Sequence, residues 1–203
     1  MAGGYEGSMR ASRNNAALME LIGTDKKLIC NFGKHLKTVM AHRHEVLRHC
    51  IKAGIPLQGL THDLSKFCPE EFINGVRFFQ GNRSPHEGER EAYGFSYAWM
   101  CHKGRNKHHF EYWWDYDPVT RKPASVKMPL KYVKEMFCDR VAASKIYKKN
   151  DYDDSCPLEY FMRAKKTRKI HPDTSRLLEK LLVMLRDKGE DYTFAYIRRM
   201  KKY

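Results

Sequence analysis

The sequence predicts an all-α protein that folds as a single helical bundle of about seven helices. Apolar residues recur every three or four positions through most of the chain, which is the spacing of an amphipathic helix. No stretch shows the sustained alternation of β-branched residues that marks a strand, and no segment repeats. The chain has 203 residues, enough for one well-buried core and too few to require two domains. We therefore expect residues 25–203 to form one domain.

The first expected helix is long and covers residues 25–53, where an apolar stripe follows one side until Gly54 and Pro56 end it. A shorter helical segment is expected at 56–67, although Gly59 interrupts it. The leucines that share one face of this segment are Leu57, Leu60 and Leu64.

A third helix is expected from Pro69, which suits an early helical position, with Glu70 and Glu71 favourable to the positive end of the helix dipole. The polar residues 81–91 contain two glycines and a proline, and they predict an exposed loop. The chain then becomes aromatic, and we expect it to be helical over residues 92–113.

A second loop is expected at 115–125, and the rest of the chain should be helical apart from short breaks. The segment 128–147 carries apolar residues at helical spacing and is ended by a polar, Asp-rich stretch. The last helical segments cover residues 157–166, 172–187 and 191–200.

Residues 1–24 are expected to be a disordered leader, because they are rich in Gly, Ser and Asn and lack the apolar segment of a secretory signal. The longest apolar runs, such as 181–185, are far shorter than the roughly 20 residues that cross a bilayer, so no membrane partner is expected. Six cysteines occur without a CxxC pair. This pattern favours reduced thiols in the core and a cytoplasmic location.

The composition is strongly basic, with a formal net charge of +14. Such a charge favours anionic partners, among them nucleotides, other phosphate esters and nucleic acid. A solvated basic surface with no specific partner explains the charge equally well. Charge therefore restricts the class of partner without choosing within it.

Histidine clustering indicates a metal site. The chain has ten histidines, and His102, His108 and His109 crowd one aromatic segment, while His62 directly precedes Asp63. Imidazole nitrogen and carboxylate oxygen are the usual ligands of catalytic zinc, iron and manganese. Burying a His-Asp pair is costly unless both side chains converge on cations. The same reasoning favours ligation by a carboxylate set among apolar residues of the 128–147 helix, Asp139.

The order of these residues resembles the HD-domain superfamily of metal-dependent phosphohydrolases in its longer, two-metal form. The ordered set is His42, His62-Asp63, His102, His108 or His109, and Asp139. The words LTHDLSKF, AWMCHKGRNKHHFEYW and MPLKYVKEMFCDR also resemble an uncharacterised bacterial and phage family known only as a domain of unknown function. The resemblance runs from about His35 to His171, which is most of the chain.

This resemblance implies an HD-type helical bundle with two divalent cations at its centre, of Mn, Fe or Mg type, with Zn also compatible. Asp63 would bridge the cations, and a hydroxide between them would attack a phosphoester. The first cation would be held by His42, His62 and Asp139, and the second by His102 and one of His108 and His109. Lys66 lies one turn after His62 and would meet a substrate phosphate, with Arg43 and Asn106 as further substrate contacts.

Several assignments have structural alternatives. His42 and His44 lie at opposite edges of the apolar stripe, so periodicity does not choose between them, and the family pattern favours His42. Arg43 could equally extend its charge to solvent past the apolar face. On a helix, His108 and His109 would point about 100° apart, so only one should reach a given metal, and His108 is favoured.

Other side chains near the expected site also have two interpretations. Glu70 and Glu71 could simply favour a helix start or could act as proton shuttles. The aromatic residues could stack on a base, although this spacing is more typical of a core. They are Trp99, Tyr112, Trp113 and Trp114. Four further histidines are expected to be structural or exposed, namely His35, His49, His86 and His171.

Three functions are compatible with these residues. The first is a hydrolase that acts on a nucleotide-like or other small phosphoester. The second is a di-iron oxygenase, a class that uses the same ligands within the HD superfamily and resembles myo-inositol oxygenase. The third is a non-catalytic module that binds nucleic acid or protein and keeps a metal for stability, although no nucleic-acid-binding motif is present.

Overall fold

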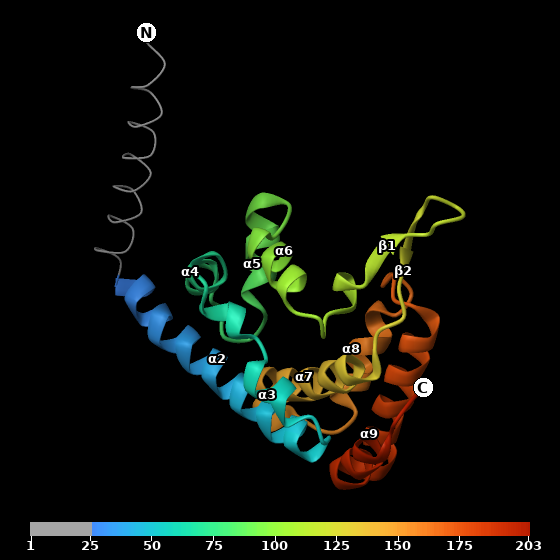
Figure 1. The fold of residues 1–203 in the computed structure, drawn as a ribbon. Coiled ribbons are helices and arrows are strands. Elements are labelled where there is room, and N and C mark those ends of the chain that lie inside the picture. Colours follow the sequence, from blue (N-terminus) through green and yellow to red (C-terminus); the bar gives the residue numbers. More distant parts are fainter. Residues whose placement is uncertain (1–25) are drawn as a thin grey trace.

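The computed structural model describes residues 26–203, and the expected leader at 1–24 lies outside the described residues. The described part is all-α, with eight α-helices and one two-stranded sheet. In Figure 1 the helices α4, α5 and α6 lie together above α7, and α9 flanks the opposite side from α2. This arrangement confirms the predicted fold class.

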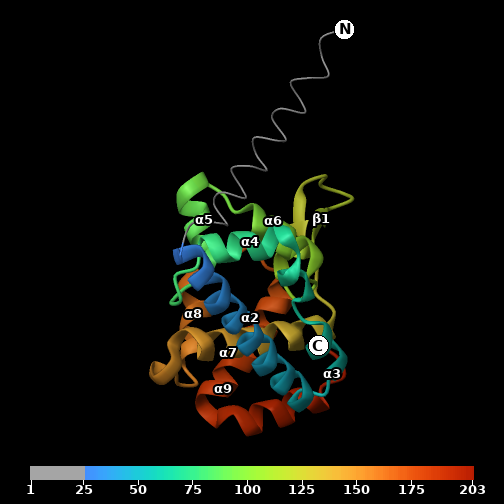
Figure 2. The ribbon, with the colours of Figure 1, turned by 90° about the vertical axis from the view of Figure 1, so that its left-hand side faces the viewer.

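Helix α2 (Lys26–Lys52) is the expected long N-terminal helix. It ends before Gly54, whose φ of +76° is the left-handed backbone conformation that glycine adopts without steric cost. Within the bundle α2 packs mainly against α3 and α7, and it crosses in front of α7 in Figure 2. Two buried residues of α2, Val46 and Cys50, enter the main core.

The expected segment 56–67 is divided into two pieces, helix α3 (Pro56–Thr61) and a 3-10 helix (Leu64–Phe67). Gly59 is the point where α3 rests on α2, because a Cβ atom here would lie 2.8 Å from the Cβ of Cys50. The three leucines of the expected face are exposed instead: Leu57, Leu60 and Leu64. The break between the two pieces falls at His62 and Asp63.

Residues 81–91 were expected to form a loop, and this is wrong, because α5 (Pro85–Tyr93) lies there after α4 (Pro69–Arg77). The buried Glu89 explains the helix: its carboxylate accepts hydrogen bonds from the Ser96 hydroxyl and the Tyr97 backbone N–H. One polar residue of this segment, Glu89, is therefore buried and contacts the start of the next helix, α6 (Tyr97–Arg105).

Two further expectations for this region are wrong. Helix α6 ends at Arg105, so the expected helix at 92–113 covers only part of that range. The loop expected at 115–125 forms a small antiparallel hairpin of β1 (Trp114–Tyr116) and β2 (Pro123–Ser125). Strands of three residues are too short to show the alternation that predicts a strand.

The C-terminal half follows the predicted helices closely. Helix α7 (Leu130–Lys148) crosses the centre of the bundle, and α8 (Cys156–Ala164) and α9 (Pro172–Arg199) pack against each other and against α7. The last two expected segments are parts of α9, whose backbone is non-helical at Gly189, with a φ of 75°. Gly189 thus separates the two helical segments that the sequence predicted, 172–187 and 191–200.

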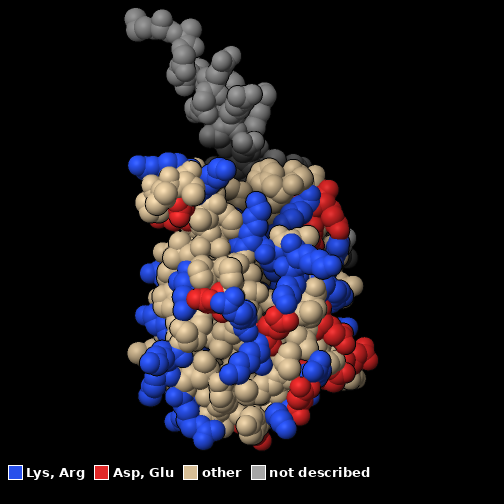
Figure 3. Space-filling model, turned by 90° about the vertical axis from the view of Figure 1, so that its right-hand side faces the viewer, with Lys and Arg blue, Asp and Glu red and all other residues tan. Residues whose placement is uncertain are grey.

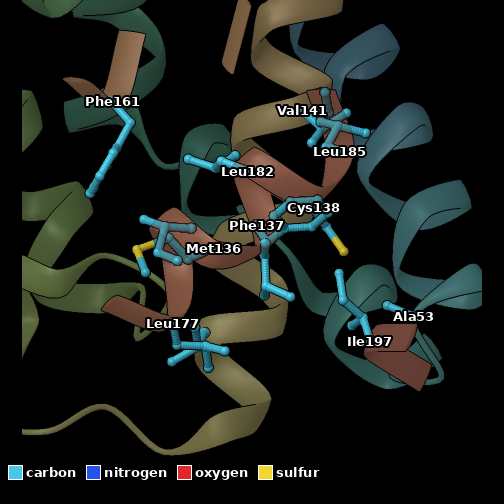
Figure 4. Close-up of a cluster of buried hydrophobic side chains, with 14 of the residues drawn as sticks. Ala53, Met136, Phe137, Cys138, Val141, Phe161, Leu177, Leu182, Leu185 and Ile197 are labelled. Atoms are coloured by element: carbon cyan, nitrogen blue, oxygen red, sulfur yellow. The ribbon is translucent and has the colours of Figure 1, made fainter. Parts of the chain in front are cut away.

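The main core lies between α7 and α9, with contributions from α2 and α8. Its largest fully buried side chains include Phe137 of α7, Phe161 of α8 and Phe194 of α9. Figure 4 shows Phe137, Leu182 and Met136 close to one another at the centre of this cluster. All six cysteines are free thiols, and three are buried, namely Cys50, Cys138 and Cys156. No helix within residues 26–203 combines the length and apolar character needed to cross a membrane.

Candidate metal centre

The predicted ligands come from five separate segments and meet beside the core. Helix α2 supplies one, the break between α3 and the 3-10 helix supplies two, α6 supplies one, the turn after α6 supplies two, and α7 supplies one. They form two neighbouring groups, and within each group all ligand atoms lie within 4.8 Å of one another. The first group is His42, His62 and Asp139, and the second is Asp63, His102, His108 and His109. Every predicted ligand is therefore present in one of the two groups.

Asp63 lies between the two groups, and each of its carboxylate oxygens faces a different group. Its Oδ2 atom is 3.3 Å from Nε2 of His62 and 3.9 Å from Nε2 of His42. Its Oδ1 atom is 3.4 Å from Nε2 of His102 and 3.4 Å from Nε2 of His108. The backbone of Asp63 has a φ of 52°, a left-handed conformation that is uncommon outside glycine. This conformation turns the chain between α3 and the 3-10 helix, where His62 and Asp63 both become buried.

The inward-facing atoms of the centre suit a cation. Within residues 26–203, five buried ligand atoms have no hydrogen-bond partner: Nε2 of His42, His62, His108 and His109, and Oδ1 of Asp63. Some of these atoms lie near a carboxylate without the geometry of a hydrogen bond. Nε2 of His42, for example, is 3.1 Å from Oδ1 of Asp139. Leaving so many buried polar atoms unpaired is costly. Divalent cations coordinated by these atoms would remove that cost, so the residues present fit metal ions.

The outward-facing nitrogens of three imidazoles are held by two buried glutamates. Oε1 of Glu135 lies 3.0 Å from Nδ1 of His62 and 3.2 Å from Nδ1 of His108. Oε2 of Glu71 lies 2.7 Å from Nδ1 of His102. In a neutral ring whose proton is on Nδ1, that proton is donated to the carboxylate and the Nε2 lone pair is directed inward, which is the arrangement that orients metal-binding histidines.

Sequence reasoning missed Glu135 and gave Glu71 a different role. Glu135 precedes Asp139 by four residues on α7, and this spacing places both on one side of the helix. That spacing was an available signal for a second acid beside the site. Glu71 lies in the first turn of α4, as expected, but it is 4% exposed and bound to His102, so its main role is not at the helix terminus.

The charges of the centre are strongly coupled. Burial by itself would raise the pKa of Asp63, but the neighbouring His62 and Lys66 outweigh burial and hold that pKa well below its usual value. Burial similarly would lower the pKa of His62, but the Asp63 carboxylate outweighs it and raises the pKa to about 10. Burial, followed by the charge of His108, lowers the pKa of His109 well below its usual value. Without a cation, Asp63 is thus ionised, His109 is neutral and His62 is protonated, so a cation bound at His62 would displace the proton of that ring.

Lys66 lies at the centre, as predicted, but two other expected substrate contacts have different partners. The Lys66 ammonium is 2.6 Å from Oδ2 of Asp63. The Arg43 guanidinium donates to the backbone carbonyls of His62 and Leu60, so it supports the turn that carries the ligands. The Asn106 amide donates to the Ser65 hydroxyl, 2.8 Å away, and to the backbone carbonyl of His102.

The structure also answers several choices that the sequence left open. His44 is exposed, whereas His42 is buried and faces the centre. Both His108 and His109 join the same ligand group, because the chain after Arg105 is a turn and not the helix on which only one would reach the site. The aromatic side chains are divided between packing and the site: Trp113 packs on the main core, while the Trp99 ring contacts those of His102 and His109.

Comparison with known proteins places the chain in a family. Residues 31–184 match the model of a family of unknown function (DUF5662). The chain belongs to this family. The DUF5662 region contains every residue of the metal centre and both supporting glutamates. The searches of curated proteins and of solved structures gave no match. The predicted resemblance to a family of unknown function is confirmed, and the resemblance to the HD-domain superfamily stays a prediction.

Proposed function

We propose that this protein is a hydrolase of phosphoesters that uses two divalent cations bridged by Asp63. The observation that carries the proposal is the position of the Asp63 carboxylate, with Oδ2 toward His42 and His62 and Oδ1 toward His102 and His108. A carboxylate with one oxygen toward each of two imidazole groups is suited to joining two cations. Cations held there would supply Lewis acidity toward water and toward a phosphoester.

The residues of the chain have distinct roles in this proposal. Glu135 fixes the ring orientation of one imidazole in each group, and Glu71 fixes a third. Lys66 is part of the site and is 26% exposed, so its ammonium can contact both Asp63 and an anionic substrate. Its positive charge would offset the charge of a phosphoester at the side of the centre that solvent reaches.

The test is an activity screen of the purified protein with added manganese, using p-nitrophenyl phosphate esters and a nucleotide panel. We expect metal-dependent release of phosphate or p-nitrophenol, and loss of both activity and bound metal in Asp63→Asn. The matched control is Asp151→Asn, which changes an exposed aspartate and should leave activity unchanged. Circular dichroism would verify that both variants fold.

Two results would contradict the proposed reaction, and a third would contradict the role of Asp63. One is a metal-loaded protein that hydrolyses nothing in the panel. The other is redox-active iron accompanied by oxygen uptake, which would indicate an oxygenase. Full activity and full metal content in Asp63→Asn would remove the bridging role of this carboxylate.

A further inference from the structure

A basic pocket is lined in part by residues that directly follow metal-centre residues in the sequence. A pocket of about 480 Å³ opens between the end of α6, the start of β1 and the segment that joins α8 to α9. This volume lies within the range of small-molecule sites, roughly 300–1,000 Å³. Its walls include three basic side chains, Lys103, Arg168 and Lys169, and two aromatic ones, Phe110 and Trp114.

The basic groups of this pocket outnumber its acidic groups and form no ion pair within the described residues. No ion pair within 4.0 Å joins Lys103, Arg168 or Lys169 to any acidic group of the described chain. One acidic side chain, Glu111, lines the same pocket, and its Oε2 atom is buried without a hydrogen-bond partner in the described residues. Three cations against one carboxylate leave the pocket positive, which favours an anion with more than one negative charge.

Two arginines have donors that the described protein does not use. Nη1 of Arg168 and Nε of Arg140 are buried and make no hydrogen bond with any part of residues 26–203. A buried guanidinium donor without an acceptor is costly, and Arg suits the oxygens of phosphate and carboxylate. Arg168 also stacks over the Tyr160 ring, with its Cζ atom 4.9 Å from the ring centroid, so its planar group has a fixed support.

The pocket and the metal centre share helix α6 and the turn that follows it. Lys103 directly follows His102 on α6, and Phe110 directly follows His109. Figure 3 shows that Lys and Arg side chains are abundant on the side of the molecule where β1 and α9 lie in Figure 1. An anionic ligand would therefore be attracted to this side before it meets the pocket.

We infer that this pocket is an anion-binding site for a phosphate-type group carried by a ligand with an aromatic or apolar part. The oxyanion meets Arg168, Lys103 and Lys169, and the rest of the ligand lies along Phe110 and Trp114. Binding here requires no metal, so the inference does not rest on the proposed phosphohydrolase activity.

The test is isothermal titration of the full-length protein with inorganic pyrophosphate and with adenosine 5′-diphosphate. We expect saturable binding of both, tighter for the nucleotide because of the aromatic wall, with quenching of tryptophan fluorescence. Arg168→Gln and Lys103→Gln should each weaken pyrophosphate binding about tenfold. The matched control is Lys166→Gln, which removes an exposed charge from the same segment outside the pocket and should change binding less than twofold.

Asp63→Asn separates this pocket from the metal centre. Pyrophosphate binding that persists in Asp63→Asn and is lost in Arg168→Gln supports the pocket even where no hydrolysis occurs. Binding lost in Asp63→Asn and unchanged in Arg168→Gln would place the anion at the metal centre and overturn the inference. Equal losses of pyrophosphate binding in Arg168→Gln and Lys166→Gln would indicate general attraction to a basic surface and would also overturn the inference. Lys169→Gln alters an exposed residue of the pocket, so it provides a second test of pyrophosphate binding if Arg168→Gln fails to fold.

Discussion

Glu135→Gln should weaken metal binding in both halves of the centre. The carboxylate of Glu135 accepts a hydrogen bond from His62 in one ligand group and from His108 in the other, at 3.0 and 3.2 Å. Glutamine keeps the shape but removes the charge. A hydrogen bond to a charged group contributes about 1.5–3 kcal/mol, against about 0.5–1.5 kcal/mol for a neutral one. The expected loss of metal-binding free energy is therefore about 1 kcal/mol or more in each half of the centre, which corresponds to roughly five- to tenfold weaker metal binding.

Glu71→Gln provides the comparison, because Glu71 contacts only His102 in the second group. Titration with manganese, with metal content measured by mass spectrometry, should show two weakened steps in Glu135→Gln and one in Glu71→Gln. Glu70→Gln changes the adjacent exposed carboxylate and should have no effect. The reasoning is wrong if Glu135→Gln leaves both steps unchanged, or if both variants weaken the same single step.

Three further outcomes follow from named contacts. His108→Ala should lower manganese affinity more than His109→Ala, because only the first ring has a carboxylate on its other nitrogen; equal losses in titration would contradict this. Gly59→Ala should reduce the free energy of unfolding in urea by about 1–3 kcal/mol, since its Cβ would lie 2.8 Å from a side-chain carbon of α2, whereas Gly33→Ala has open space and should not destabilise. Burial lowers the pKa of His49 to about 4, so the unfolded chain binds its proton more readily, and stability that is full above pH 6.5 is lost as the pH falls toward 4. Between pH 7 and pH 5 this loss is about 2 kcal/mol, and His49→Gln should remove it from the urea unfolding curves.

The long helices and the ligand types could be predicted because each depends on local signals. Apolar periodicity over 27 residues defines α2, and a His-Asp pair is costly in a core unless it binds a cation. Helix α5 could not be predicted in this way, because its stability comes from the buried Glu89, whose partners lie at the start of α6. A polar helix that packs through one carboxylate has the composition of a loop.

The expectation that only one of His108 and His109 reaches the site depended on α6 continuing through both residues, because consecutive positions on a helix point in different directions. The helix ends at Arg105, where the Asn106 amide donates to the carbonyl of His102 and begins a turn. Only this turn lets two adjacent imidazoles approach one carboxylate oxygen, and a helix end of this kind is set by contacts with Ser65, 41 residues away in sequence.

The supporting residue Glu135 could have been predicted from its position on α7. A carboxylate on the buried face of α7 needs a partner, and the residue four positions later, Asp139, was already assigned to the metal. Two acids of like charge on one helix face repel each other unless positive groups lie between them. His62 and His108 meet that need, since each directs one nitrogen to Glu135 and the other toward the ligand set. Pairs of acids at this spacing on a core helix, opposite histidines from other segments, are therefore a sequence signal for the support of a metal centre as well as for its ligands.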